Sequence, residues 1–188
     1  MSAERESPRK RSRAAALQVL FSLEFAGREV RGADEDPKDG GEEAADGAEA
    51  AAEPTEDVGD APAEGESGSS LAARAQAAFD EVGAHFELPE GARAFAKELV
   101  LGVARHRGSL DRQIGEHANN WRIERMASVD RNVLRLGAYE LLHGDAPVAV
   151  VIDEAVELAR RFGGDRSPGF VNGVLDALAA AVRPPEPG

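Results

Sequence analysis

The stretch VDRNVLRLGAYELL at residues 129–142 decides the fold class. Its large apolar residues return every three or four positions, which is the spacing of one face of an α-helix. Ser128 supplies a capping hydroxyl in front of the stretch, and Gly144 stands where the pattern ends. The apolar stripe consists of Val129, Val133, Leu136, Tyr139 and Leu142. We therefore predict an amphipathic helix here, buried along one side.

The segments on either side repeat this helical pattern. Ser7-Pro8 and Ser167-Pro168 each combine a capping hydroxyl with a proline whose fixed φ suits the first helical turn. Further helices are predicted from Ser70 to Gly83, around residues 90–103, around residues 109–117 and after Pro147, with a short turn at residues 121–126. Residues 148–152 are the one strand-like run, and they have no strand to pair with. The chain is therefore predicted to be all-α, with about seven helices.

Residues 31–70 differ from the rest of the chain in composition. They hold fourteen Asp and Glu residues against Arg31 and Lys38, and Val58 is their one large aliphatic residue. Such a segment cannot bury enough apolar surface to offset roughly 1–2 kcal/mol of backbone entropy per residue. We predict a disordered acidic insertion at 31–70, between a basic segment with the first helix (1–30) and the remaining helices (71–188). Almost all of the net charge of −13 belongs to this insertion, so the folding part is close to neutral.

Several kinds of protein are excluded by the composition. The sequence has no cysteine, which excludes disulfides and cysteine nucleophiles and agrees with a reducing cytoplasm. No apolar run is long enough for a secretory signal or a membrane span. The four histidines lack metal-ligand spacing, no phosphate-binding glycine loop is present, and Asp153, Glu154 and Glu157 are typical of a helix surface. We therefore expect a cytoplasmic protein that is not an enzyme and holds neither metal nor cofactor.

Three groups of basic residues are candidates for contact with nucleic acid. They are Arg5, Arg9, Lys10, Arg11 and Arg13 at the N-terminus, then Arg105, His106 and Arg107, and finally Arg131 and Arg135. The N-terminal group attracts phosphates but is equally typical of a solvated chain end. The second group follows a predicted helix, where the helix dipole alone favours cations. The third lies near a helix start, where a cation opposes the dipole and an external anion is favoured.

Two aromatic residues are candidates for stacking on a nucleobase. Phe21 lies on the apolar stripe of the first helix, which favours a partly buried ring. Phe170 lies in the first turn after Ser167-Pro168, where a ring either packs across the helix start or offers its face to an unpaired base. The residues alone leave both interpretations of Phe170 open.

Four motifs, in this order along the chain, resemble the NusB family of transcription antitermination factors. They are ALQVLF at 16–21, VDRNVLRLGAYELL at 129–142, VIDEAVELA at 151–159 followed by Phe162-Gly163, and FVNGVLD at 170–176. The resemblance covers about residues 7–30 and 71–183. It implies a NusB-like fold of two small helical bundles packed together.

The resemblance also implies a function and a binding surface. Family members bind the single-stranded boxA element of ribosomal RNA leaders. They pair with NusE, a ribosomal protein of the small subunit, and help RNA polymerase read through terminators with other Nus factors. Matched position by position, the family's RNA surface falls on Arg9, Lys10, Arg13, Phe21, Asp130, Arg131, Arg135 and Phe170, with Arg105 and Arg107 beside them. Two positions depart from the family's pattern, since Phe21 stands where tyrosine is common and Arg166 where some relatives have an acid.

Two other functions remain open at this point. One is a structural homodimer that buries the predicted RNA surface, since some relatives dimerise. The other is an RNA-binding domain like those fused to ribosomal RNA cytosine methyltransferases. Those enzymes need a cofactor domain with a Gly-rich turn and a cysteine nucleophile, and this sequence has neither. We therefore predict an RNA-binding adaptor that acts on boxA RNA together with NusE.

Overall fold

All regular elements in the described part of the chain are helices. The computed structural model describes residues 7–29, 68–83, 88, 90–118 and 121–183. Its elements are α1 (Pro8–Glu29), α2 (Gly68–Gly83), α3 (Glu90–His117), the 3-10 helix η1 (Ile123–Arg125), α4 (Ser128–His143), α5 (Val148–Phe162) and α6 (Ser167–Val182). The all-α prediction is confirmed, and the strand-like residues 148–152 form the start of α5.

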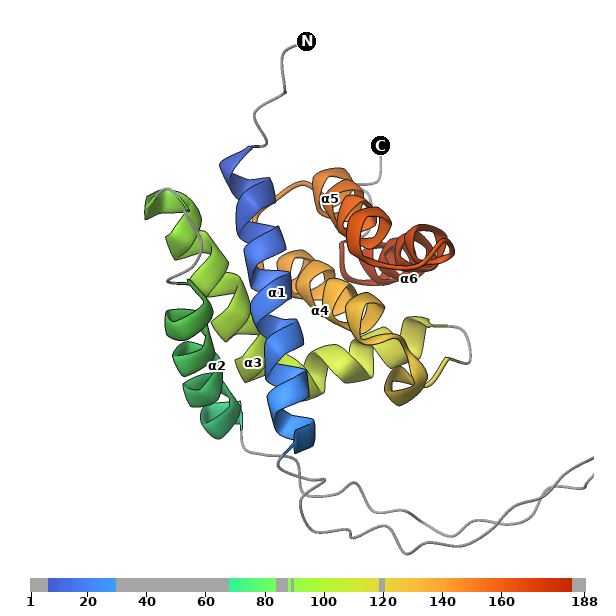
Figure 1. The fold of residues 1–188 in the computed structure, drawn as a ribbon. Coiled ribbons are helices and arrows are strands. Elements are labelled where there is room, and N and C mark those ends of the chain that lie inside the picture. The colour runs from blue at the N-terminus through green and yellow to red at the C-terminus, as the bar shows by residue number, and fades with distance from the viewer. Residues whose placement is uncertain (1–6, 30–67, 84–87, 89, 119–120, 184–188) are drawn as a thin grey trace, which may run out of the picture.

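The helices form two small bundles that share α4 as their link. Helices α1, α2 and α3 pack on one another, and α4, α5 and α6 form the second group (Figure 1). Because α4 also packs against α1 and α3, one apolar core runs through both bundles. Phe79, Leu99, Leu134 and Leu175, from four different helices, are almost completely buried in it. The predicted two-bundle arrangement is confirmed.

The predicted serine caps are only partly correct. The Ser7 hydroxyl accepts a hydrogen bond of 3.3 Å from the backbone N–H of Lys10, as expected of a cap before a proline. The Ser167 hydroxyl instead accepts from the backbone N–H of Gly164 at 2.9 Å, so it closes the turn in front of α6. Ser128 is the first residue of α4 and makes no capping bond. For these three helices, the position of the start was therefore predicted better than the capping chemistry.

The two helices predicted around residues 90–103 and 109–117 are one continuous helix, α3. The Ser109 hydroxyl bonds back to the carbonyl of His106 at 2.8 Å and does not cap a new helix. Gly108 in a helix interior costs about 1 kcal/mol relative to alanine, but Leu110 and Ile114 continue the buried face beyond it. Residues 105–107 thus lie in mid-helix, so the dipole explanation for their charge does not apply.

Two predictions fall on parts of the chain outside the described residues. The acidic insertion at 31–70 lies outside them, apart from residues 68–70 in the first turn of α2. Arg5, predicted as part of the basic N-terminal group, also lies outside the described residues. In the described residues, no helix is long and apolar enough to cross a membrane.

Candidate nucleic-acid interface

The residues predicted to contact RNA lie at three places on the fold. The first is the start of α1, with Arg9, Lys10 and Arg13. The second is where α1, the middle of α3 and the start of α4 meet, with Phe21, Arg105, Arg107, Asp130, Arg131 and Arg135. The third is the first turn of α6, with Phe170. Each place has its own balance of exposed and internally paired groups.

Two cations at the start of α1 reach the surface. Arg9 is exposed, and its guanidinium carbon lies 4.9 Å from the centre of the Phe95 ring. The Lys10 ammonium lies 3.6 Å from the Glu154 carboxylate on α5, and its side chain is 43% exposed. An ion pair of this exposure is weak, because water screens it and the long side chain stays mobile. Both charges therefore remain available to an external phosphate.

Arg13, only one turn further along α1, is buried. Its Nε and Nη2 atoms donate hydrogen bonds of 2.8 and 2.6 Å to the two carboxylate oxygens of Glu140 on α4. Glu154 lies 3.6 Å away on a third helix, α5. Such a bidentate pair is strong in a buried setting, where a lone charge would be very costly. The sequence predicts Arg13 at the RNA surface, whereas in the structure its charge fixes α1 against α4.

A second network joins α1, α3 and α4 around the Glu24 carboxylate. Arg131 donates two hydrogen bonds to it, of 3.0 and 2.8 Å, and Arg135 donates one of 2.6 Å. Arg135 also donates to both oxygens of Asp111 on α3, at 2.6 and 2.8 Å. Burial alone would raise the pKa of Glu24. The hydrogen bond from Arg131 and the charges of Arg135 and Arg131 outweigh it and lower that pKa below its usual value.

Because of this network, the two arginines on α4 have a different role from the one predicted. The sequence predicts that Arg131 and Arg135 attract an external anion, but Glu24 and Asp111 already neutralise them. Both acids were missed, because Glu24 lies 107 residues from Arg131 and Asp111 lies 24 residues from Arg135. One signal was present in the sequence, since Glu24 continues the apolar stripe of α1 one turn after Leu20.

Other predicted residues near this network are more open. Arg105 and Arg107 are exposed on α3, and the Arg107 guanidinium lies 3.9 Å from the Asp111 carboxylate. Phe21 on α1 is 36% exposed. Asp130 at the start of α4 is half-buried, and in the described part of the chain its Oδ1 atom has no hydrogen-bond partner. Arg105, Arg107 and Phe21 therefore offer cations and a ring face to an outside ligand, whereas the Oδ1 atom of Asp130 is buried.

Phe170 shares the third place with Trp121, an aromatic residue that is not among those predicted from the sequence. Its half-buried ring packs against the edge of the core, and its centre lies 5.7 Å from that of Trp121 with the planes inclined by 55°. Trp121 is 57% exposed. It comes from the segment between α3 and η1. The sequence did contain a signal for this residue, because Trp121 is the one tryptophan of the chain and stands next to Arg122.

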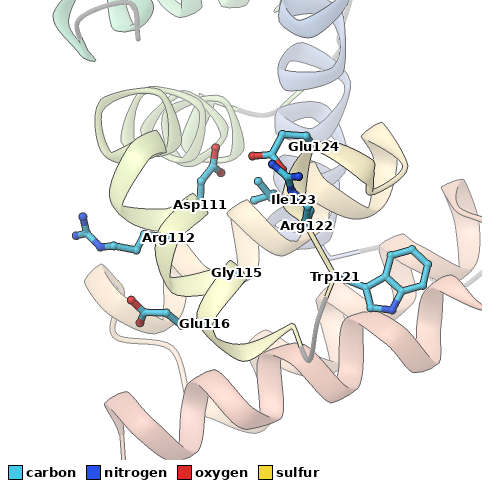
Figure 2. Close-up of a pocket in the computed structure, with 8 residues that line it drawn as sticks. All are labelled: Asp111, Arg112, Gly115, Glu116, Trp121, Arg122, Ile123 and Glu124. Carbon is cyan, nitrogen blue, oxygen red and sulfur yellow. The ribbon is translucent and has the colours of Figure 1, made fainter. Parts of the chain in front are cut away.

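A groove of about 650 Å³ runs beside Trp121, between the last turns of α3 and η1. Its lining consists of Asp111, Arg112, Gly115, Glu116, Trp121, Arg122, Ile123 and Glu124. Figure 2 shows Trp121 at one end, projecting toward α6 and away from the other labelled side chains. Arg122 and Glu124 are both highly exposed and lie 3.8 Å apart. Acids and bases alternate along the groove, so it carries no strong net charge.

Known proteins similar to this chain agree on one family. The family model described as "NusB family" matches residues 49–180. The "Transcription antitermination protein NusB" of Sorangium cellulosum is 58% identical over 92 residues, which are 48% of this chain and 65% of the relative. The protein of that name from Solibacter usitatus is 46% identical over 121 residues, or 61% of this chain and 81% of the relative. The chain thus spans slightly less than two thirds of the Sorangium relative.

Solved structures agree in fold over a longer stretch. T. maritima NusB matches with a TM-score of 0.63 and 30% identity, covering 93% of this chain and 92% of that one. A chain from the complex of "Antitermination Factors NusB and NusE" with dsRNA matches with a TM-score of 0.61 and 25% identity, covering 93% and 97%. The family model, the relatives and the two-bundle fold lead to the same conclusion. This chain belongs to the NusB family.

Proposed function

We propose that this chain is a transcription antitermination factor that binds the boxA RNA of ribosomal RNA leaders together with NusE and promotes read-through by RNA polymerase. The observation that carries the proposal is its likeness to the chain from the NusB–NusE–RNA complex, over 93% of its length. The factor acts by binding and not by catalysis, and it meets other Nus factors and the polymerase through that complex. Transcription takes place in the bacterial cytoplasm, so we place it there.

The proposed RNA surface follows the exposed groups. Lys10 and Phe21 are eleven residues apart on α1, which is about three turns, so they lie on one stripe about 16 Å apart. Phosphates of a single strand would contact Arg9 and Lys10, and a base would stack on Phe21. Further along, Arg105, Arg107, Asp130 and Phe170 complete the list of direct contacts. In this arrangement, contacts with phosphates supply affinity for the RNA strand, and contacts with the rings hold its unpaired bases.

The buried arginines have a different role in this proposal. Arg13, Arg131 and Arg135 hold α1, α3 and α4 in register through Glu140, Glu24 and Asp111. A phosphate reaches these arginines only by displacing a carboxylate from a short, shielded pair. We therefore assign them to positioning the RNA surface and not to direct contact with RNA.

The test is a binding titration with fluorescently labelled boxA RNA, with and without NusE. A scrambled RNA of the same composition serves as the control. The proposal predicts tighter binding to boxA than to the scrambled RNA, and a further gain in affinity when NusE is present. Equal affinity for both RNAs, unaffected by NusE, would contradict it. A stable dimer in light scattering that is indifferent to RNA would instead support the structural homodimer.

A further inference from the structure

We propose that Trp121 and Phe170 together form a seat for one unpaired RNA base, with Trp121 as the main stacking surface. This inference rests on the proposed function and adds a residue that the family resemblance did not assign. It starts from the ring pair, whose centres lie 5.7 Å apart with planes inclined by 55°. At that inclination the rings are tilted and not stacked face to face, so Phe170 covers at most one side of the indole. The 57% exposure of Trp121 agrees with an open face.

Described residues on both sides of Trp121 are bonded to, or buried in, the rest of the fold. The backbone N–H of Trp121 donates to the carbonyl of Ala118 at the end of α3, at 3.1 Å. On the other side, Arg131 donates to the carbonyl of Ile123 at 3.1 Å, and Met126 is buried in the core. A ring on such a support loses little conformational entropy when a ligand stacks on it. Arg131 therefore acts as a positioning residue for the seat.

The surroundings favour an RNA base over a protein partner. Among the described residues, the exposed large hydrophobic side chains are Phe21 on α1, Val150 on α5 and Trp121 between α3 and η1. A stable protein interface needs about 800 Å² per partner with an apolar centre, and a single exposed indole does not supply that. A base needs only one flat ring, since every base has a π-face.

The charges near the ring pair suit a phosphate backbone. Exposed arginines stand at 122, 125 and 166, against the exposed acids Glu124 and Asp165. The Arg122–Glu124 contact of 3.8 Å joins two side chains that are 75% and 71% exposed. Such a pair is worth little, so it leaves Arg122 able to turn toward a phosphate. The sequence on either side of the two rings thus carries an excess of exposed cations, which attracts a phosphate backbone.

The experiment uses the intrinsic fluorescence of the full chain, because Trp121 is its only tryptophan. Unlabelled boxA RNA is titrated into the protein, and the fluorescence is compared with the anisotropy of labelled RNA in a parallel titration. Stacking predicts saturable quenching with the same midpoint as binding. Trp121→Ala is expected to weaken binding about 5- to 150-fold, which corresponds to one stacked base. Trp121→Phe should keep most of the affinity, and Trp121→Leu should lose it although it remains apolar.

Three results would overturn the inference. The first is normal RNA binding with unchanged Trp121 fluorescence and full affinity in Trp121→Ala, which removes the seat and leaves the proposed function intact. The second is a fluorescence change that appears only on adding a tryptophan-free NusE, with RNA affinity of Trp121→Ala unchanged, which makes the ring a protein contact. The third is no RNA binding with or without NusE, which removes the proposed function as well. If Trp121→Ala does not fold, the fluorescence titration of the unmodified chain and the RNA affinity of Trp121→Phe still test the inference.

Discussion

Arg13 on α1 and Glu140 on α4 form a two-bond ion pair in which the side chains are only 4% and 6% exposed. The pair joins the two helical bundles at their shared helix. Arg9, one turn earlier on the same helix, is exposed. The basic segment therefore contains both a structural cation and surface cations, and substitutions in it must be interpreted residue by residue.

Arg13→Ala should lower the free energy of unfolding by about 3–5 kcal/mol, because it leaves the buried Glu140 carboxylate without its partner. Urea unfolding followed by circular dichroism measures this loss. The matched control is the double variant Arg13→Met with Glu140→Leu, which removes both charges and should be close to neutral. A normal urea midpoint for Arg13→Ala, combined with weaker RNA binding, would show that Arg13 contacts RNA directly.

The Glu24 network predicts a loss of stability in acid. The pKa of Glu24 in the folded chain lies below its usual 4.5, so the unfolded chain takes up a proton first as the pH falls. The stabilisation is therefore complete above about pH 4.5 and is lost as the pH falls through the lowered pKa. Urea midpoints between about pH 6 and pH 3 should fall more steeply for the unmodified chain than for Glu24→Gln.

The control for this experiment removes an exposed carboxylate. Glu157 pairs with Arg160 at 2.6 Å on the surface of α5, where the side chains are 53% and 61% exposed. Glu157→Gln should therefore change the midpoint little at every pH. Identical acid profiles for Glu24→Gln and the unmodified chain would mean that the network does not stabilise the fold.

The sequence predicts the helices better than it predicts the partners of their charged residues. Ser7-Pro8 and Ser167-Pro168 mark helix starts locally, because the serine hydroxyl and the proline both lie within a few residues of the start. By contrast, Glu24 meets Arg131 across 107 residues, and no local pattern encodes that contact. A charge alone does not tell whether it faces water or an acid on a distant helix. For the same reason the sequence did not predict a role for Trp121, because that role depends on Phe170, which lies beside it only in the folded chain.

Gly102 on α3 should not tolerate alanine, because a methyl group there would overlap the Tyr139 ring on α4. The ring would have to leave its place beside His143, whose ring centre lies 5.1 Å away. Gly102→Ala is therefore expected to cost about 1–3 kcal/mol of stability. Gly108→Ala on the same helix meets nothing within 4 Å and should stabilise by about 0.5–1 kcal/mol.

Adding Tyr139→Ala tests the cause of the Gly102 effect. Without the ring, Gly102→Ala should become favourable, as Gly108→Ala is, so the two changes at Gly102 and Tyr139 will be non-additive in a double-mutant cycle. Thermal or urea unfolding of the four chains provides the cycle. Additive losses would place the strain elsewhere on α3.

Arg9→Ala with Lys10→Ala should weaken binding to all RNA sequences equally, because phosphate contacts carry no sequence information. The slope of log affinity against log salt should fall by about 0.7 for each lost contact with a single strand. The melting temperature should change little, since Arg9 is exposed and the Lys10 pair is only weakly shielded. Arg160→Ala, which removes an exposed cation outside the proposed surface, should leave the salt slope unchanged. An unchanged slope for the double variant as well would move the phosphate contacts away from the start of α1.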